Sequence, residues 1–159
     1  MNFHRKNTSF ACRYSLLPVL ILIFAGMFVP RAAGASPSTH YPLTIEDSLG
    51  NKITIDEAPQ RVVLAGKATL ITANAYYLFE EARKKVVAIG KTNQGLGNFL
   101  PYIDSDYENA AKLPHQVGPE QVVAKRPDLV IVKSFMYKRL GEPLSKLGIP
   151  VVALDLESP

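Results

Sequence analysis

The chain of 159 residues has no tryptophan and one cysteine, Cys12. Cys12 lies in an N-terminal segment that we expect to be removed, so residues 36–159 contain no cysteine. This absence excludes disulfide bonds, a thiol nucleophile and a thiolate metal site from that part. Two histidines remain there, His40 and His115, whereas a zinc site takes about three or four ligands. A receptor that chelates a bare metal ion is therefore disfavoured, and it stays open as an alternative.

The sequence also lacks the short motifs of common nucleotide-binding and hydrolytic sites. Residues 90–92 (GKT) match the end of a phosphate-binding loop, but Lys85 stands where that loop requires glycine. Residues 95–97 (GLG) are followed by Leu100 where a dinucleotide fingerprint has its third glycine. No GxSxG elbow is present, and no glycine turn follows Ser134. We therefore predict a binding protein without a cofactor. The alternative is an exported α/β enzyme whose catalytic residues lie beyond residue 159.

Residues 1–35 have the pattern of a cleaved secretory signal peptide. Three basic residues precede the apolar run 16–29, and residues 33–35 (AGA) form a small-x-small cleavage site. The run is shorter than the roughly 18–20 residues that cross a bilayer, which makes a membrane anchor the weaker interpretation. Cys12 precedes the run, whereas a lipid-modified cysteine would follow it. We expect export without a lipid anchor, and a polar linker at residues 36–42.

The positive charge of the chain belongs to this leader. The chain has 18 basic and 14 acidic residues, and the leader contains four of the basic residues and no acidic one. Removal of the leader leaves equal numbers of basic and acidic residues. A nucleic-acid interface would keep a basic patch after cleavage. We therefore predict no nucleic-acid partner.

Residues 43–159 predict one α/β domain, with a Rossmann-like parallel sheet, helices on both faces and a small N-terminal β-hairpin. Residues 43–45 and 53–55 alternate apolar and polar side chains on either side of a glycine turn, which is typical of a hairpin. Continuous apolar runs suit strands that are covered on both faces. Such runs lie at residues 61–65, 86–89, 129–132 and 151–154, with a candidate third strand at 115–117. Residues 69–85 predict a helix with one apolar stripe. The stripe consists of Ile71, Ala75, Leu78 and Ala82.

The last third of the chain predicts a βαβ unit most clearly. Pro119 suits the first position of a helix, and Glu120 suits the first turn, where the helix dipole favours a negative charge. Pro127 ends that helix, and an apolar strand follows. Gly148 then ends a second helix before the final apolar strand. A parallel sheet follows from this order of elements.

This region resembles a known family. Residues 119–132 (PEQVVAKRPDLVIV) and 144–155 (LSKLGIPVVALD) are similar to the N-terminal lobe of periplasmic substrate-binding proteins of ABC importers for iron-siderophores, heme and cobalamin. Two lobes joined by one long helix characterise that family. The resemblance covers residues 43–159 and implies a chain truncated before the interlobe helix. Ser158 and Pro159 suit the N-cap and first turn of such a helix.

The resemblance also implies a function. A member of this family is periplasmic, captures a chelated-metal cargo such as a ferric siderophore, heme or cobalamin, and docks on an ABC permease in the inner membrane. Glu120 matches the glutamate of the family motif, which implies a role in permease docking. The other interpretation of Glu120 is a first-turn acid that offsets the helix dipole. A standalone single-lobe adaptor or chaperone also remains open.

Candidate cargo-binding residues follow the predicted strands. In open parallel sheets, ligands bind outside the carboxyl ends of the strands. Lysines after three of the strands favour an anionic cargo. Ordinary loop and helix-cap chemistry is the alternative explanation for each residue. The candidates are Lys67, Thr69, Lys91, Thr92, Asn93, Gln94, Lys133, Ser134 and Tyr137.

Overall fold

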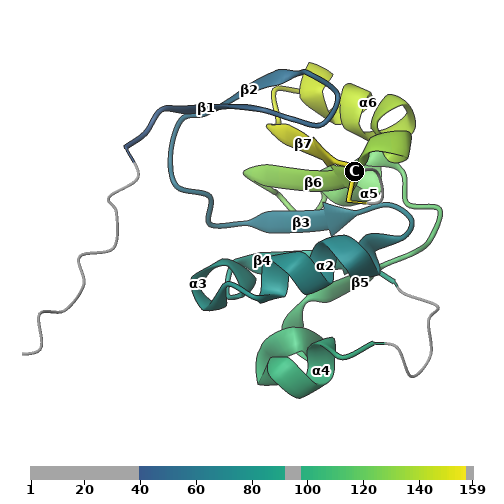
Figure 1. The fold of residues 1–159 in the computed structure, drawn as a ribbon. Coiled ribbons are helices and arrows are strands. Elements are labelled where there is room, and N and C mark those ends of the chain that lie inside the picture. Colours follow the sequence, from purple (N-terminus) through teal and green to yellow (C-terminus); the bar gives the residue numbers. More distant parts are fainter. Residues whose placement is uncertain (1–39, 92–97, 157–159) are drawn as a thin grey trace, which may run out of the picture. The chain divides into compact units, whose positions relative to one another are not determined.

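A parallel sheet of five strands organises the computed structural model, which describes residues 40–91 and 98–156 (Figure 1). The order across the sheet is β5-β4-β3-β6-β7, and every neighbouring pair is parallel. The first strand of the sheet in sequence, β3, is therefore its centre, and the chain builds outward in both directions. The predicted α/β fold class is confirmed. The strands are β3 (Val62–Ala65), β4 (Val86–Gly90), β5 (Ala111–Leu113), β6 (Leu129–Lys133) and β7 (Val151–Leu154).

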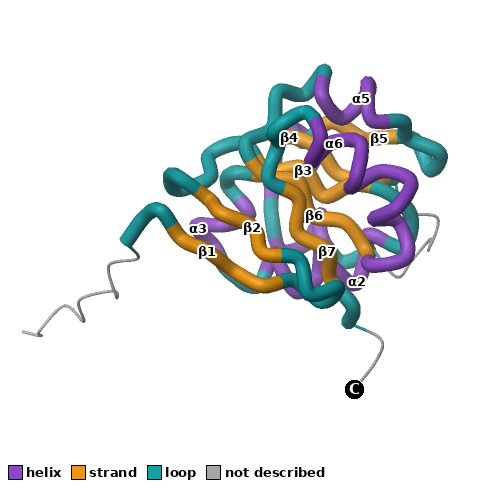
Figure 2. Tube along the Cα trace, turned by 90° about the horizontal axis from the view of Figure 1, so that it is seen from above, coloured by secondary structure: helices purple, strands orange, loops and turns teal. Residues whose placement is uncertain are grey.

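Helices cover both faces of the sheet (Figure 2). Side chains alternate along the central strand, so Val62 and Leu64 face one core while Val63 and Ala65 face the other. The first core, which we call the α2-side core, packs against α2 (Thr69–Tyr77) and α4 (Leu100–Ile103). The second, the α6-side core, packs against α5 (Pro119–Val123), the 3-10 turn η4 (Ser134–Met136), the π-helical turn η5 (Tyr137–Gly141) and α6 (Glu142–Lys146).

The predicted hairpin is present as β1 (Leu43–Glu46) and β2 (Lys52–Ile55), and its turn is tied to strand β7. Asp47 is buried in this turn. One carboxylate oxygen accepts the N–H groups of Leu49 and Asn51, both at 2.9 Å. The other accepts the Asn51 side-chain amide at 3.0 Å and the Ala153 N–H at 3.2 Å. Ser48 completes the link, because its N–H and hydroxyl both donate to the Ala153 carbonyl.

The helix predicted at residues 69–85 is shorter and oriented differently. The first helix, α2, ends at Tyr77, and the separate α3 spans Glu80–Arg83 after an extended Phe79. The buried residues of α2 include Leu70, Ala73 and Tyr77. The predicted stripe instead lies outward, since Ile71, Ala75 and Leu78 are all exposed. Apolar side chains lie on both sides of this helix, and the side that the sequence pattern predicted to be buried is the one that faces solvent.

The predicted strand at residues 115–117 is wrong. Residues 111–113 form β5 and pair with β4, while His115 and Gln116 lie in a turn. The sequence did not predict β5, because this strand is only three residues long and has Lys112 in its middle. Residues 105–109 before it form a 3-10 helix, η3 (Ser105–Asn109).

The Pro-Asp pair of the family-like motif joins two distant segments. Asp128 accepts the N–H groups of Gln60 at 2.7 Å and of Arg61 at 2.8 Å. In return, the Arg61 guanidinium donates to the carbonyls of Arg126 at 2.9 Å and Lys125 at 2.8 Å. These bonds align the start of β3 with the start of β6. Asp128 is therefore explained by strand alignment at the amino edge of the sheet.

Among residues 40–91 and 98–156, no helix combines the length and the apolar character that a membrane span requires. The predicted signal peptide, the predicted helix start at Ser158, and the candidates Thr92, Asn93 and Gln94 lie outside the described residues.

Candidate functional site: the carboxyl edge of the sheet

The strand order defines one edge at which a ligand is expected. The chain proceeds from β3 to β4 on one side and returns to β6 on the other, so the topological switch point lies between β3 and β6. Crevices at such points, outside the carboxyl ends of the strands, are the usual ligand sites of open α/β sheets. The segments at this edge begin at Gly66 after β3, Lys91 after β4, Pro114 after β5 and Ser134 after β6.

Two glycines let the ends of β3 and β4 and the start of α2 approach each other closely at this edge. Gly66 has a φ of 100°, a left-handed conformation that glycine adopts without strain. A Cβ on Gly90 would lie 2.7 Å from the Gly66 carbonyl oxygen and 2.8 Å from Thr69 Cγ2. The Thr69 hydroxyl donates to the Gly90 carbonyl at 3.0 Å. The buried Thr69 therefore connects the start of α2 to the end of β4, and its hydroxyl already donates to a backbone carbonyl.

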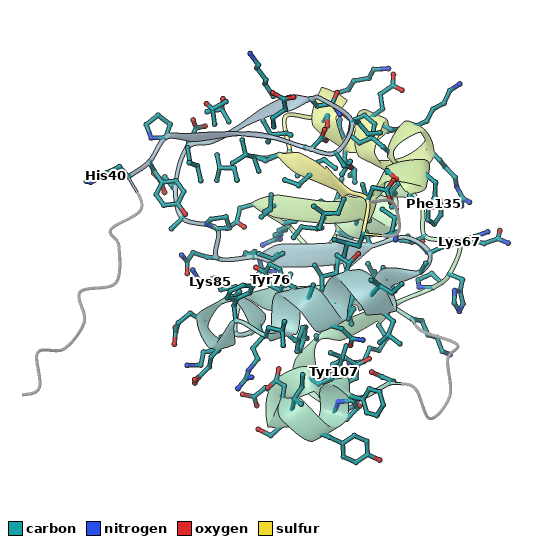
Figure 3. All side chains as sticks on the ribbon, in the orientation of Figure 1. His40, Lys67, Tyr76, Lys85, Tyr107 and Phe135 are labelled. Carbon is teal, nitrogen blue, oxygen red and sulfur yellow. The ribbon has the colours of Figure 1, made fainter. Side chains whose placement is uncertain are left out.

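The three candidate lysines differ in exposure. Lys67 and Lys91 are exposed, whereas Lys133 is only 1% exposed at the end of β6. The alternation along β6 places Lys133 on the same side as Ile131, toward the α2-side core. Lys67 and Phe135 lie at one edge of the sheet, and Lys85 and Tyr76 lie at the opposite edge (Figure 3). The structure thus presents exposed lysines after two strands, β3 and β4, and it buries the lysine at the end of β6.

Ser134 and Tyr137, the remaining described candidates, follow Lys133 in η4 and η5. Both are partly exposed. The Tyr137 ring packs over Gly141, where a Cβ would lie 2.5 Å from Tyr137 Cδ2, and it contacts the α6-side core. Between them, Phe135 is 57% exposed. Sequence reasoning did not select Phe135, although its place directly after a buried strand was a usable signal.

His115 also lies at this edge, although it is not among the cargo-binding candidates predicted from the sequence. It follows β5 by one residue beyond Pro114 and is half-buried. Its Nε2 atom is buried and has no hydrogen-bond partner among residues 40–91 and 98–156. Buried polar atoms are normally paired. The described residues hold no group of three or more histidine, cysteine, aspartate or glutamate side chains close enough to share a metal ion.

A hollow lies at the opposite, amino edge of the sheet. It measures about 380 Å³ and is lined by Arg83, Lys84, Asp104 and Asp106 together with Tyr77. Nearby, burial raises the pKa of Tyr76 to about 12, and the charge of Asp128 adds to this shift. The side chains here carry both signs of charge. The carboxyl edge differs from it in having exposed lysines after β3 and β4, with Asp155 as an exposed acidic residue after β7.

Comparison with known proteins gives a consistent result, although no family model matches the chain. The chain is 27% identical over 117 residues to the molybdate-binding protein MolA of Haemophilus influenzae. The solved structure of MolA bound to molybdate gives a TM-score of 0.50 and covers 72% of the chain. A periplasmic solute binding protein from Veillonella parvula gives a TM-score of 0.56 at 21% identity and covers 70% of the chain.

A third structure is SirA of Staphylococcus aureus in complex with staphyloferrin B, with a TM-score of 0.53 at 21% identity over 71% of the chain. In every case the chain spans about a third of the relative: 32% of MolA by sequence, 34% of the Veillonella protein and 36% of SirA. This partial coverage fits one lobe of a larger binding protein. The resemblance predicted from the sequence is confirmed, and the chain has the fold of one lobe of the periplasmic binding proteins of ABC importers.

Proposed function

We propose that the chain is part of the extracytoplasmic solute-binding component of an ABC importer. It would capture cargo at the carboxyl edge of its sheet and deliver it to a permease. The observation that supports the proposal is the strand order of a fold shared with binding proteins, in which the exposed Lys67 and Lys91 follow β3 and β4 at the carboxyl edge. The mechanism is binding and release, without chemical turnover.

The two exposed lysines, Lys67 and Lys91, favour an anionic cargo. Clustered charges of one sign raise the local concentration of oppositely charged solutes and speed their association. A ferric siderophore, heme or cobalamin is the cargo class implied by the sequence resemblance, and the complex of SirA with staphyloferrin B is compatible with the siderophore choice. An oxyanion is the second candidate, because MolA is a molybdate-binding protein and shares 27% identity with the chain.

The other functional classes have less support. A bare metal-ion receptor would need a ligand cluster, and the described part of the chain contains none. An exported enzyme would need catalytic groups, whereas the relatives named above are binding proteins. Export to the periplasm through cleavage after residue 35 remains part of the proposal, and so does the docking role of Glu120. Glu120 is exposed in the first turn of α5, where both docking and a dipole role are sterically open.

Neutralising the exposed lysines of the carboxyl edge tests the cargo class. We expect Lys67→Gln and Lys91→Gln each to weaken binding of an anionic cargo by roughly two- to fivefold, because exposed charges contribute up to about 1 kcal/mol. The effect should shrink as salt is raised, since screening removes it. Isothermal titration of the complete exported protein with a ferric siderophore, heme, cobalamin and molybdate measures the affinities.

The matched control is Lys85→Gln, which removes a lysine at the amino edge and should leave every affinity unchanged (Figure 3). If Lys85→Gln weakened binding as much as the carboxyl-edge variants, a general charge effect would replace the proposed site. If none of the four cargoes bound, the receptor assignment itself would be lost.

A further inference from the structure

The hollow of about 380 Å³ at the amino edge of the sheet lies away from the proposed cargo site. Its apolar lining comes from Val86 and Val87 at the start of β4 and from Ala110 directly before β5. Sites for small molecules are concave and mostly apolar, have a few polar groups that fix the ligand, and measure roughly 300–1,000 Å³. The hollow lies at the small end of this range, which suits a ligand about as large as an amino acid.

The hydroxyl of Tyr77 is the polar group that points to a ligand. Tyr77, at the end of α2, is only 1% exposed and lines the hollow. Its ring packs edge-on against Tyr107, with ring centroids 6.3 Å apart, and this contact holds the ring in place. Within the described residues the hydroxyl has no hydrogen-bond partner. Because buried polar groups are normally paired, this hydroxyl is available to a molecule bound in the hollow.

Arg83 brings a positive charge to the hollow from the end of α3. It is half-buried and forms no salt bridge within the described part of the chain. The neighbouring Lys84 is already engaged, because its Nζ lies 3.0 Å from the carboxylates of both Glu80 and Glu81. A planar guanidinium can bind a carboxylate through two parallel hydrogen bonds. Arg83 is therefore the group that would hold an anion here.

Asp104 brings a negative charge to the same hollow from the turn between α4 and η3. One of its carboxylate oxygens accepts the Asp106 N–H at 3.0 Å, which leaves the second oxygen for a ligand. Burial raises the pKa of Tyr77, the charge of Asp104 raises it further, and the charge of Arg83 lowers it. Both charges therefore act on the Tyr77 hydroxyl. No ion pair joins Arg83 to Asp104 in the described part of the chain, so a ligand can lie between them.

We propose that this hollow is a second binding site, which takes a small zwitterion of the α-amino-acid type with an aliphatic side chain. Arg83 and the Tyr77 hydroxyl hold the carboxylate, Asp104 holds the ammonium group, and the aliphatic side chain packs on the apolar lining. A metal ion fits poorly, because the described residues contain no cluster of three or more metal-ligating side chains and Arg83 would repel it. A simple anion fits poorly because Asp104 would repel it. The inference does not depend on the proposed importer function.

Titration of the complete exported protein with L-leucine tests the proposal, with calorimetry and amide chemical shifts as readouts. We expect saturable binding with a Kd of roughly 1 mM or tighter. The shifts of Tyr77, Arg83 and Asp104 should change. Two analogues of L-leucine should each bind at least about tenfold more weakly, because each leaves one charge of the hollow unpaired. These are 4-methylpentanoate, which lacks the ammonium group, and 3-methylbutylamine, which lacks the carboxylate.

The variant Tyr77→Phe locates the ligand, since it keeps the ring and removes only the hydroxyl. Because that hydroxyl has no partner among the described residues, we expect an unchanged thermal midpoint together with about tenfold weaker binding of L-leucine. Arg83→Gln and Asp104→Asn should weaken binding at least as much, because each removes a charge-assisted hydrogen bond. Tyr102→Phe is the matched control, since Tyr102 is 85% exposed on α4 and does not line the hollow.

Three results would overturn the inference. If L-leucine did not bind, the second site would be lost. If either analogue bound as tightly as L-leucine, the hollow would recognise a single charge and not a zwitterion. If Tyr77→Phe bound L-leucine like the wild type, the ligand would lie elsewhere on the protein. Each of these results would leave the affinity for cargo at the carboxyl edge, and with it the proposed importer function, untouched.

Discussion

The chain by itself is expected to bind its cargo roughly a thousandfold more weakly than a two-lobed receptor would. The proposed site is one edge of one lobe, and the relatives are about three times as long as the matched region. If a complete receptor reached micromolar affinity, about −8 kcal/mol, and this lobe supplied half of that free energy, the isolated lobe would bind near the millimolar range. Titrating residues 36–159 with a ferric siderophore, heme or cobalamin, with binding detected by calorimetry or NMR, measures this affinity.

The comparison needs a control for folding, because an unfolded lobe would also fail to bind. A cooperative thermal transition of the same preparation provides it. Micromolar or tighter binding by the isolated lobe would contradict a cleft shared between two lobes. It would favour the alternative of a single-lobe adaptor.

Replacing Asp47 with alanine is expected to destabilise the protein by about 2–4 kcal/mol. The substitution removes four hydrogen bonds to a carboxylate, and bonds to charged groups contribute about 1.5–3 kcal/mol each when they are not shared within one network. It also leaves the Ala153 N–H at the end of β7 without its acceptor. Denaturant titration of the free energy of unfolding measures the change. Asp56→Ala is the matched control, since Asp56 is exposed directly after β2.

The hydrogen bonds of the Asp47 carboxylate also predict that the stability of the protein depends on pH. Burial raises the pKa of Asp47, but its hydrogen bonds to Asn51, Leu49 and Ala153 together outweigh burial and hold the pKa below the ordinary value of 3.8. A carboxyl whose folded-state pKa lies below its unfolded-state pKa stabilises the protein fully above the unfolded value. That contribution is lost as the pH falls through the folded value. The gap in stability between wild type and Asp47→Ala should therefore be full near pH 7 and shrink below about pH 4. If this difference in stability did not change with pH, the ionised carboxylate of Asp47 would not be the group that stabilises the turn.

Local signals predicted most of the fold. The hairpin, the buried strands β3, β4, β6 and β7, and the short helix that begins at Pro119 all lie where the sequence pattern placed them. Each has a signal in its own residues: alternation, a continuous apolar run, or a proline at a helix start. The α2 stripe failed because Ile71 and Leu78 are as apolar as Leu70 and Ala73, and only the tertiary packing decides which set is buried.

Pairing between distant segments decided the parts that were not predicted. Ala111–Leu113 is a strand because β4 offers it a partner, and its own three residues contain no clear strand pattern. Likewise, Thr69 is buried because it packs against Gly90 at the end of β4, and no local pattern predicts this contact or the burial of Lys133. Asp128 illustrates the same limit, since its partners Gln60 and Arg61 lie more than 60 residues away in sequence.

Mapping the cargo onto the chain tests the central claim most directly. Amide chemical shifts of the chain can be followed while molybdate, cobalamin or a siderophore loaded with gallium in place of iron is added. We predict that the shifts that change gather at Gly66–Thr69, Lys91, His115 and Lys133–Phe135, all at the carboxyl edge of the sheet. Unchanged shifts with every candidate cargo, or changes gathered around Lys84 and Asp104 at the amino edge, would contradict the proposed site.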